Sequence, residues 1–154
     1  MIIELMDATG RLPIKLRKIN LWCTSVLSIF SLSNVSLVIR IVDIEEGRHL
    51  NHTYRKTDHA TNVLSFPADI SLPKGPRILG DIAICLPVIE AEALAQNKTL
   101  EQHFAHMIVH GILHLLGFDH INDDDLKKME TKEIGILGKL GYANPYLGQD
   151  QMIE

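Results

Sequence analysis

Four histidines lie close together in the segment HMIVHGILHLLGFDH, residues 106–120. Two of them, His110 and His114, are four residues apart. On a helix this spacing places them about 40° apart around the axis and about 6 Å apart along it. Gly117 favours a helix end, and His120 follows three residues later, so the chain can fold back toward the first two imidazoles. The spacing therefore predicts a metal site made of His110, His114 and His120.

Three neutral imidazoles are ligands that suit zinc and leave a fourth position open to water. Water in that position becomes a usable hydroxide near neutral pH. Nickel or another divalent metal is compatible with the same ligands, because affinity alone does not set metal identity. We therefore expect one zinc ion, with nickel or another divalent ion as the alternative.

Gly111 occupies the position at which zinc peptidases of the H-E-x-x-H-x-x-G-x-x-H type carry a glutamate. That glutamate is the general base of peptide hydrolysis, and glycine cannot transfer protons. The metal-binding half of the motif is thus complete while the proton-transfer half is missing. Either another residue transfers the proton or the reaction differs, and the sequence identifies no general base.

Further polar residues near the motif have less specific explanations. His103 and His106 lie on nearly the same helical stripe and are alternative ligands, but His106 is an extra turn away from the chain reversal. We therefore expect both to be structural or to lie at the rim of the site. Asp119 either orients an imidazole, faces solvent or caps the turn. The acidic run at 123–125 is accounted for by the dipole of the helix it begins, so it predicts no second metal site.

Arg55 is the second candidate functional residue. Its guanidinium is permanently charged and presents a planar fork of donors suited to phosphate. An ordinary ion pair, for example with Asp58, is the alternative that the residues alone leave open.

The pattern of apolar residues, prolines and glycines predicts an α+β fold. We expect one domain spanning 1–154, with about four strands in a mixed sheet covered by helices and the metal site on a central helix and its following turn. Pro67 is expected to stop the third strand, so that 67–78 form a loop. Capping boxes are expected where Asp43 and Thr99 begin helices. The expected strands are 1–8, 35–43, 62–66 and 79–86, and the expected helices are 13–33, 43–55, 87–96, 99–117 and 123–141.

Composition and cysteine usage suit an ordinary globular protein. The chain has 154 residues, of which 46% are hydrophobic, enough for one domain with a buried core. Cys23 and Cys85 show no C-x-x-C spacing, so neither a disulfide framework nor a thiolate zinc site is indicated. The basic and apolar segment 15–33 is too short to span a bilayer and has no cleavage site after it. We expect a soluble cytoplasmic protein with no membrane partner.

The net charge of −4 excludes a wholly basic nucleic-acid binder. Residues 1–60 carry 8 Lys/Arg and 6 Asp/Glu, and 61–154 carry 7 and 13, giving +2 and −6. Two solvated faces of one domain explain this uneven distribution. A local basic patch also explains it, and such a patch is enough to hold a phosphate backbone.

The sequence resembles the bacterial YbeY family of ribosomal-RNA maturation endoribonucleases. Three blocks carry the resemblance: NHTYRKTDHATNVLSFP (51–67), LGDIAIC (79–85) and HMIVHGILHLLGFDH (106–120). The segment LGYANPYL (140–147) adds a less specific match. The resemblance covers most of 35–147.

The resemblance implies a function and a set of site residues. By it, His110, His114 and His120 hold a zinc-like metal at one end of a groove, and Arg55 is functionally required. The implied activity is single-strand-specific endoribonuclease cleavage in 3′ end maturation of small-subunit ribosomal RNA and in ribosome quality control. The implied partners are ribosomal RNA, small-subunit proteins and assembly factors, while the oligomeric state stays open.

Our leading hypothesis is therefore metal-assisted cleavage of an RNA phosphodiester, in which Arg55 stabilises the charge that develops on the phosphate. Basic residues of the N-terminal half, such as Arg40, Arg48 and Lys56, would steer the RNA backbone. One rival is a metallopeptidase-like hydrolase, suggested by the histidine spacing. The other is a non-catalytic ribosome-assembly factor with a structural metal.

Overall fold

A computed structural model describes residues 1–119 and 121–147 of the chain. Within these residues the strands form one mixed sheet in the order β1-β2-β4-β3. β1 pairs with β2, and β2 with β4, in parallel, whereas β3 and β4 form an antiparallel hairpin. The expected α+β fold with a four-stranded mixed sheet is confirmed. The strands are β1 (Ile2–Asp7), β2 (Val35–Val42), β3 (Val63–Ile70) and β4 (Arg77–Cys85).

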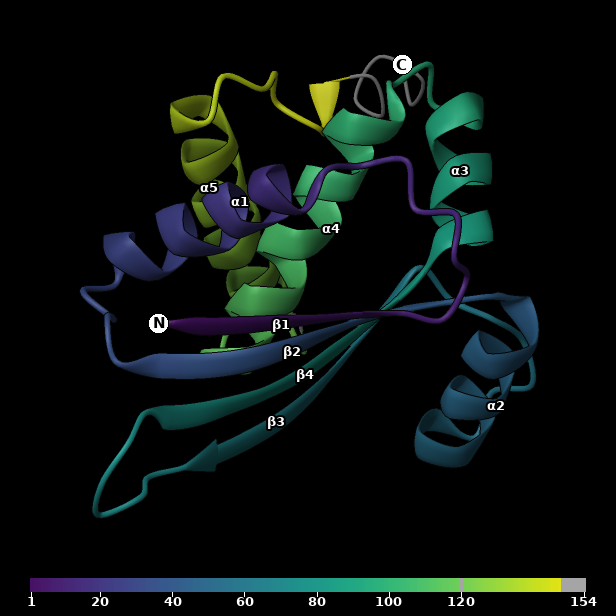
Figure 1. Cartoon of the computed structure of the whole chain (residues 1–154). Coiled ribbons are helices and arrows are strands. Elements are labelled where there is room, and N and C mark those ends of the chain that lie inside the picture. The colour runs from purple at the N-terminus through teal and green to yellow at the C-terminus, as the bar shows by residue number, and fades with distance from the viewer. Residues whose placement is uncertain (120, 148–154) are drawn as a thin grey trace.

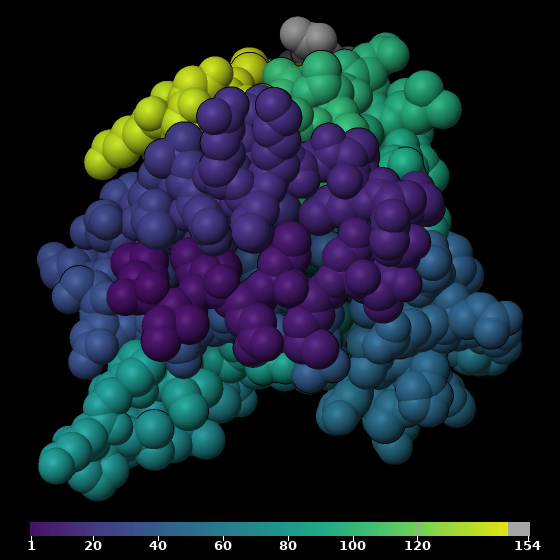
Figure 2. Space-filling model, viewed as in Figure 1, coloured from purple at the N-terminus to yellow at the C-terminus, as the bar shows by residue number. Residues whose placement is uncertain are grey.

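The helices surround this sheet unevenly (Figure 1). α1, α4 and α5 lie together over one face, whereas α2 lies on the other side of the sheet (Figure 1). The tip of the β3–β4 hairpin projects from the body of the molecule (Figure 2). Among the described residues, no helix is both long and apolar enough to cross a membrane. The helices are α1 (Leu16–Ile29), α2 (Ile44–Arg55), α3 (Leu86–Ala95), α4 (Leu100–Leu115) and α5 (Asp123–Lys139).

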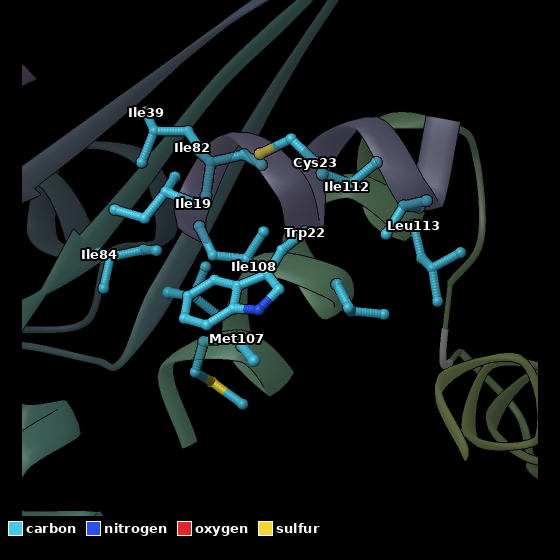
Figure 3. Packing of buried hydrophobic residues seen from close by; sticks show 14 of the residues in the cluster. Ile19, Trp22, Cys23, Ile39, Ile82, Ile84, Met107, Ile108, Ile112 and Leu113 are labelled. Carbon is cyan, nitrogen blue, oxygen red and sulfur yellow. The ribbon is translucent and has the colours of Figure 1, made fainter. Parts of the chain in front are cut away.

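α4 is the central helix of the core. Its side chains Ile108 and Ile112 are fully buried and pack with Ile82 of β4 and Ile19 of α1 (Figure 3). A helix buried on most of its circumference is fixed by the elements around it. Polar side chains on α4 are therefore held in defined positions.

Local signals set the start of α4 as predicted. Gln102 N donates to Thr99 Oγ1 at 3.1 Å, and Thr99 N donates to Gln102 Oε1 at 3.0 Å. The prediction of a capping box at Asp43 is wrong, because the Asp43 carboxylate makes no capping hydrogen bond. It lies instead 3.8 Å from the guanidinium of Arg11.

The prediction that Pro67 ends the third strand is also wrong. β3 continues to Ile70, and Pro67 pairs with Gly80 of β4. β3 is an edge strand, where a residue without an N–H is tolerated. Gly80 has φ +140°, and a Cβ there would lie 2.2 Å from the carbonyl oxygen of Phe66. Within 67–78, residues 67–70 and 77–78 thus belong to the hairpin strands, and only 71–76 form the loop.

Candidate functional site

His110 and His114 lie one turn apart on α4, both half-buried. Their Nε2 atoms are 3.1 Å apart, and their ring centroids are 4.6 Å apart with the rings nearly perpendicular. The spacing of four residues therefore converges two ring nitrogens on one point, as the sequence predicts.

The chain turns sharply directly after these histidines. Gly117 has φ +99°, and its N–H donates to the carbonyl of His114 at 3.1 Å. The N–H of Phe118 donates to the carbonyl of Leu113 at 3.0 Å. These two bonds form a Schellman motif, in which glycine readily takes the left-handed position. The prediction that Gly117 terminates the metal-motif helix is confirmed, with the helix itself ending at Leu115.

His120, the third predicted ligand, lies outside the described residues. Within the part of the chain that is described, no three metal-ligating side chains form a complete cluster. The two histidines that are described do fit a metal ion. Zinc–nitrogen bonds of about 2.0–2.1 Å in a tetrahedral site place two nitrogens about 3.3 Å apart, close to the distance between His110 and His114.

Glu133 of α5 accepts hydrogen bonds from two histidines of α4, His106 and His110. His110 Nδ1 donates to Glu133 Oε1 at 2.7 Å, and His106 Nε2 donates to Glu133 Oε2 at 2.5 Å. The hydroxyl of Tyr146 also donates to Glu133 Oε2. The side chain of Glu133 is only 1% exposed. One buried carboxylate thus joins two histidines of α4 to the C-terminal segment.

These contacts determine the charge of the cluster. Burial alone would raise the pKa of Glu133, but the hydrogen bonds from His106 and His110 outweigh it and lower that pKa to about 2. Burial lowers the pKa of His106, against the opposing effect of Glu133. Burial and the nearby carboxylate raise the pKa of Tyr146. At neutral pH the cluster therefore holds one negative charge on Glu133 beside neutral His106 and Tyr146.

A second carboxylate–histidine pair lies further along α4. His103 Nε2 is 2.9 Å from Glu92 Oε1, and Asn62 donates to the same carboxylate at 3.1 Å. His103 and His106 are both buried. The structural role expected for them stays a prediction.

Arg55 is the last residue of α2, and Lys56 ends the helix in the left-handed conformation with φ +59°. One contact with the sheet and one with the following loop hold this helix end in place. The Tyr54 ring packs edge-on against Phe66 of β3 at 4.8 Å between centroids. Buried Asn51 donates to the carbonyl of His59 at 2.7 Å.

Arg55 and His114 line the same cavity of about 290 Å³, which we call the Arg55–His114 groove. Residues from α2, the edge strand β3 and the turn after α4 meet there. Asp119 also lines the groove, and its predicted role in orienting an imidazole stays a prediction. The lining residues are Arg55, Ser65, Pro67, His114, Gly117, Phe118 and Asp119.

The predicted alternative for Arg55, an ion pair with Asp58, is not formed. Asp58 instead accepts two hydrogen bonds from Arg48, at 2.7 and 2.9 Å. Among the described residues Arg55 forms no ion pair, and its side chain is exposed. Arg40, like Arg48, is engaged by a carboxylate, that of Asp81 at 3.1 Å.

Gly111 packs directly against the sheet. A Cβ at this position would lie 2.9 Å from Ile82 Cγ2 and 3.1 Å from Ile82 Cδ1. Ile82 is fully buried, so it has no space to move into. Any side chain at position 111 would therefore start inside the core, which explains why glycine stands where the peptidase motif has glutamate.

Three further residues of this region, Glu133, Tyr146 and Ser65, are not predicted from the sequence. Ser65 Oγ donates to the carbonyl of Gly111 at 3.0 Å and so ties β3 to α4. A signal for Glu133 was present in the sequence. It falls on the same helical stripe as Met129, Ile136 and Leu137, and an acidic residue on a buried stripe needs a partner.

Comparison with known proteins places this geometry in a family. A family model described as Endoribonuclease YbeY matches residues 6–141. A protein of that name from Cellvibrio japonicus is 47% identical over 144 residues, which cover 94% of this chain and 81% of the relative. Another from Pseudomonas putida is 52% identical over 127 residues, which cover 81% and 80%.

The fold is shared with a solved structure. The solution structure of TM1509 from Thermotoga maritima matches with a TM-score of 0.59 and 25% identity, covering 91% of each chain.

Proposed function

The chain belongs to the YbeY endoribonuclease family and is thus a hydrolase acting on RNA, and we propose that it cleaves single-stranded RNA in the Arg55–His114 groove. The proposed ligands of a metal ion are His110, His114 and His120. One observation carries this proposal: the arginine and the histidine, far apart in sequence, line one cavity.

Arg55 is suited to hold the scissile phosphate. Its guanidinium carries a permanent charge and a fork of donors that matches phosphate oxygens. The helix end that carries it is anchored through Tyr54 and Asn51. Its part in the reaction is to stabilise the charge that develops on the phosphate oxygens.

The histidine side of the groove is preorganised for a cation. Zinc, or nickel or another divalent ion, when bound there would supply positive charge and acidify a water molecule. His110 is held by Glu133 with its Nε2 directed toward His114. Because Arg55 and His114 line one cavity, we propose that a phosphate bound there contacts both the arginine and the cation.

A single strand suits the surface around the groove better than a duplex. RNA single strands expose base faces that stack on aromatic side chains. Tyr54, next to Arg55, is 63% exposed and presents its ring beside the groove-lining strand β3.

The proposed biological substrate is the 3′ end of small-subunit ribosomal RNA, in maturation and in ribosome quality control. Small-subunit proteins and assembly factors are the proposed partners, and the cytoplasm, where that RNA is processed, is the proposed location. Residues 1–154 would act as one domain. Lys56 is a better candidate than Arg40 or Arg48 for guiding the backbone, since carboxylates occupy the other two.

A cleavage assay tests this function. The zinc-loaded protein should cut a labelled single-stranded RNA but leave the same sequence intact within a duplex, and His114→Ala should cut neither. A 3′-extended small-subunit ribosomal RNA should be cut near its mature end. Equal cleavage by wild type and His114→Ala would indicate a contaminating nuclease and contradict the proposal.

Two rival functions make different predictions. A metallopeptidase needs a base at position 111, and the packing of Gly111 on Ile82 leaves no space for one. A non-catalytic assembly factor with a structural metal would unfold on metal removal, and its intact metal-loaded form would cleave no RNA.

A further inference from the structure

Glu133 lies at the meeting point of three segments that are separate in the sequence. It stands on α5, and it receives hydrogen bonds from His106 and His110 on α4 and from Tyr146 beyond α5. Its two carboxylate oxygens divide these donors. Oε1 accepts from His110, while Oε2 accepts from His106 and Tyr146. A buried carboxylate with this many donors is fixed in position and charge.

The contact with His110 decides which of its ring nitrogens carries the proton. A carboxylate accepts and cannot donate, so the hydrogen on a neutral His110 ring sits on Nδ1, 2.7 Å from Glu133 Oε1. The lone pair is then on Nε2, the atom that lies 3.1 Å from Nε2 of His114. By accepting the hydrogen bond from Nδ1, Glu133 thus leaves Nε2 of His110 free of hydrogen and able to bind a metal.

We propose that Glu133 is the positioning residue of the metal site, fixing the tautomer and ring orientation of His110 so that its Nε2 faces the metal, with His106 and Tyr146 holding the carboxylate in place. This inference rests on the proposed function, because it takes His110 to be a metal ligand. It goes beyond it by assigning a role to a residue outside the histidine motif.

Burial explains why the arrangement is rigid. The side chains of Glu133 and His106 are 1% and 8% exposed, against 23% for His110. His110 is thus more accessible than the carboxylate that holds it and than His106. The buried hydrogen bonds to Glu133 restrict how His110 can turn, which orients the ligand before a metal arrives.

The chain offers a matched control for a purely structural role. Glu92 makes a similar contact with His103, at 2.9 Å, on the same helix. His103 is not among the proposed ligands. Glu92→Gln and Glu133→Gln therefore both replace a carboxylate bound to an α4 histidine, but only the second should affect metal binding.

The first measurement is zinc affinity of the full chain, by competition with a chromogenic chelator. Glu133→Gln should raise the zinc dissociation constant by about 10- to 100-fold, the usual effect of losing such a partner. Glu92→Gln should leave it unchanged. Equal affinity of wild type and Glu133→Gln, or equal losses in both variants, would overturn the inference.

The second measurement needs no substitution and so does not depend on the variant folding. Long-range proton–nitrogen correlation spectra of the metal-free wild type should show His110 protonated on Nδ1, and zinc should shift its Nε2 signal. A His110 ring protonated mainly on Nε2, or zinc bound through Nδ1, would overturn the inference.

The two proposals fail in distinguishable ways. A wild-type chain that binds none of zinc, nickel and manganese would contradict the proposed metal site and this inference together. A wild type that binds zinc, with Glu133→Gln equally tight, would contradict the inference alone and leave the proposed function standing.

Discussion

The Nε2 atoms of His110 and His114 lie 3.1 Å apart on α4, and His114 lines the same groove as Arg55 of α2. The histidine pair is a local product of helical spacing, whereas Arg55 is brought in by tertiary packing of α2 on the edge of the sheet. The site therefore combines a motif readable in sequence with a partner that only the fold supplies.

Metal binding should stabilise the fold measurably. Zinc held at 100 times its dissociation constant should raise the free energy of unfolding of the wild type by about 2.7 kcal/mol. His114→Ala should lose most of this gain, because one of the converging imidazoles is missing. Urea unfolding with and without zinc measures both values.

His49→Ala is the control for that experiment, since His49 is an exposed histidine of α2 outside the groove. It should keep the full gain. An undiminished gain in His114→Ala would contradict the metal site, whereas a wild type that is unfolded without zinc would favour a structural metal.

Gly111 should not tolerate even a methyl group. Gly111→Ala places a Cβ against Ile82 and should cost about 1–3 kcal/mol of stability, the usual effect of overpacking a core. Gly135→Ala is the matched control, since position 135 is also helical but a Cβ there meets nothing within 4 Å. It should stabilise by up to about 1 kcal/mol through helix propensity. Denaturant midpoints that fall equally in both would refute the packing explanation.

Stability should fall at alkaline pH because of Cys23. Burial raises the pKa of this thiol from 9.0 to about 12 in the folded protein. Above pH 9 the unfolded thiol loses its proton while the folded one keeps it, so the unfolded state is favoured as pH rises. The contribution is about 1.4 kcal/mol per pH unit until the folded pKa is reached.

Cys23→Ala removes this titration and should show a shallower loss of stability between pH 9 and 11. Urea unfolding at each pH gives both slopes. Parallel slopes for the two proteins would show that Cys23 does not titrate on unfolding.

The elements that follow local rules are predictable from the sequence. Thr99 with Gln102 marks the start of α4, and Gly117 marks the turn after it, because capping and left-handed glycine act within a few residues. The strand end predicted at Pro67 is wrong because an edge strand tolerates proline. That β3 lies at the edge is a property of the whole sheet, which the segment alone does not reveal.

The candidate site is predictable only in part, for the same reason. The histidine spacing predicts two converging imidazoles. Which arginine pairs with Asp58 depends instead on how α2 packs against the following loop, and Arg48 forms that ion pair in place of Arg55. Glu133 shows up in sequence as an acidic residue on an apolar stripe, but which histidine it holds depends on the packing of α5 on α4.

The most direct test of the central claim, that Arg55 and the histidine site act on one phosphate, is the single-turnover cleavage rate of single-stranded RNA by Arg55→Ala. The control is Arg17→Ala, an exposed arginine of α1 that does not line the groove. We predict that Arg55→Ala binds zinc as tightly as wild type but cleaves about 10²- to 10³-fold more slowly. Arg17→Ala should match wild type. An Arg55→Ala protein that cleaves at the wild-type rate would contradict the account.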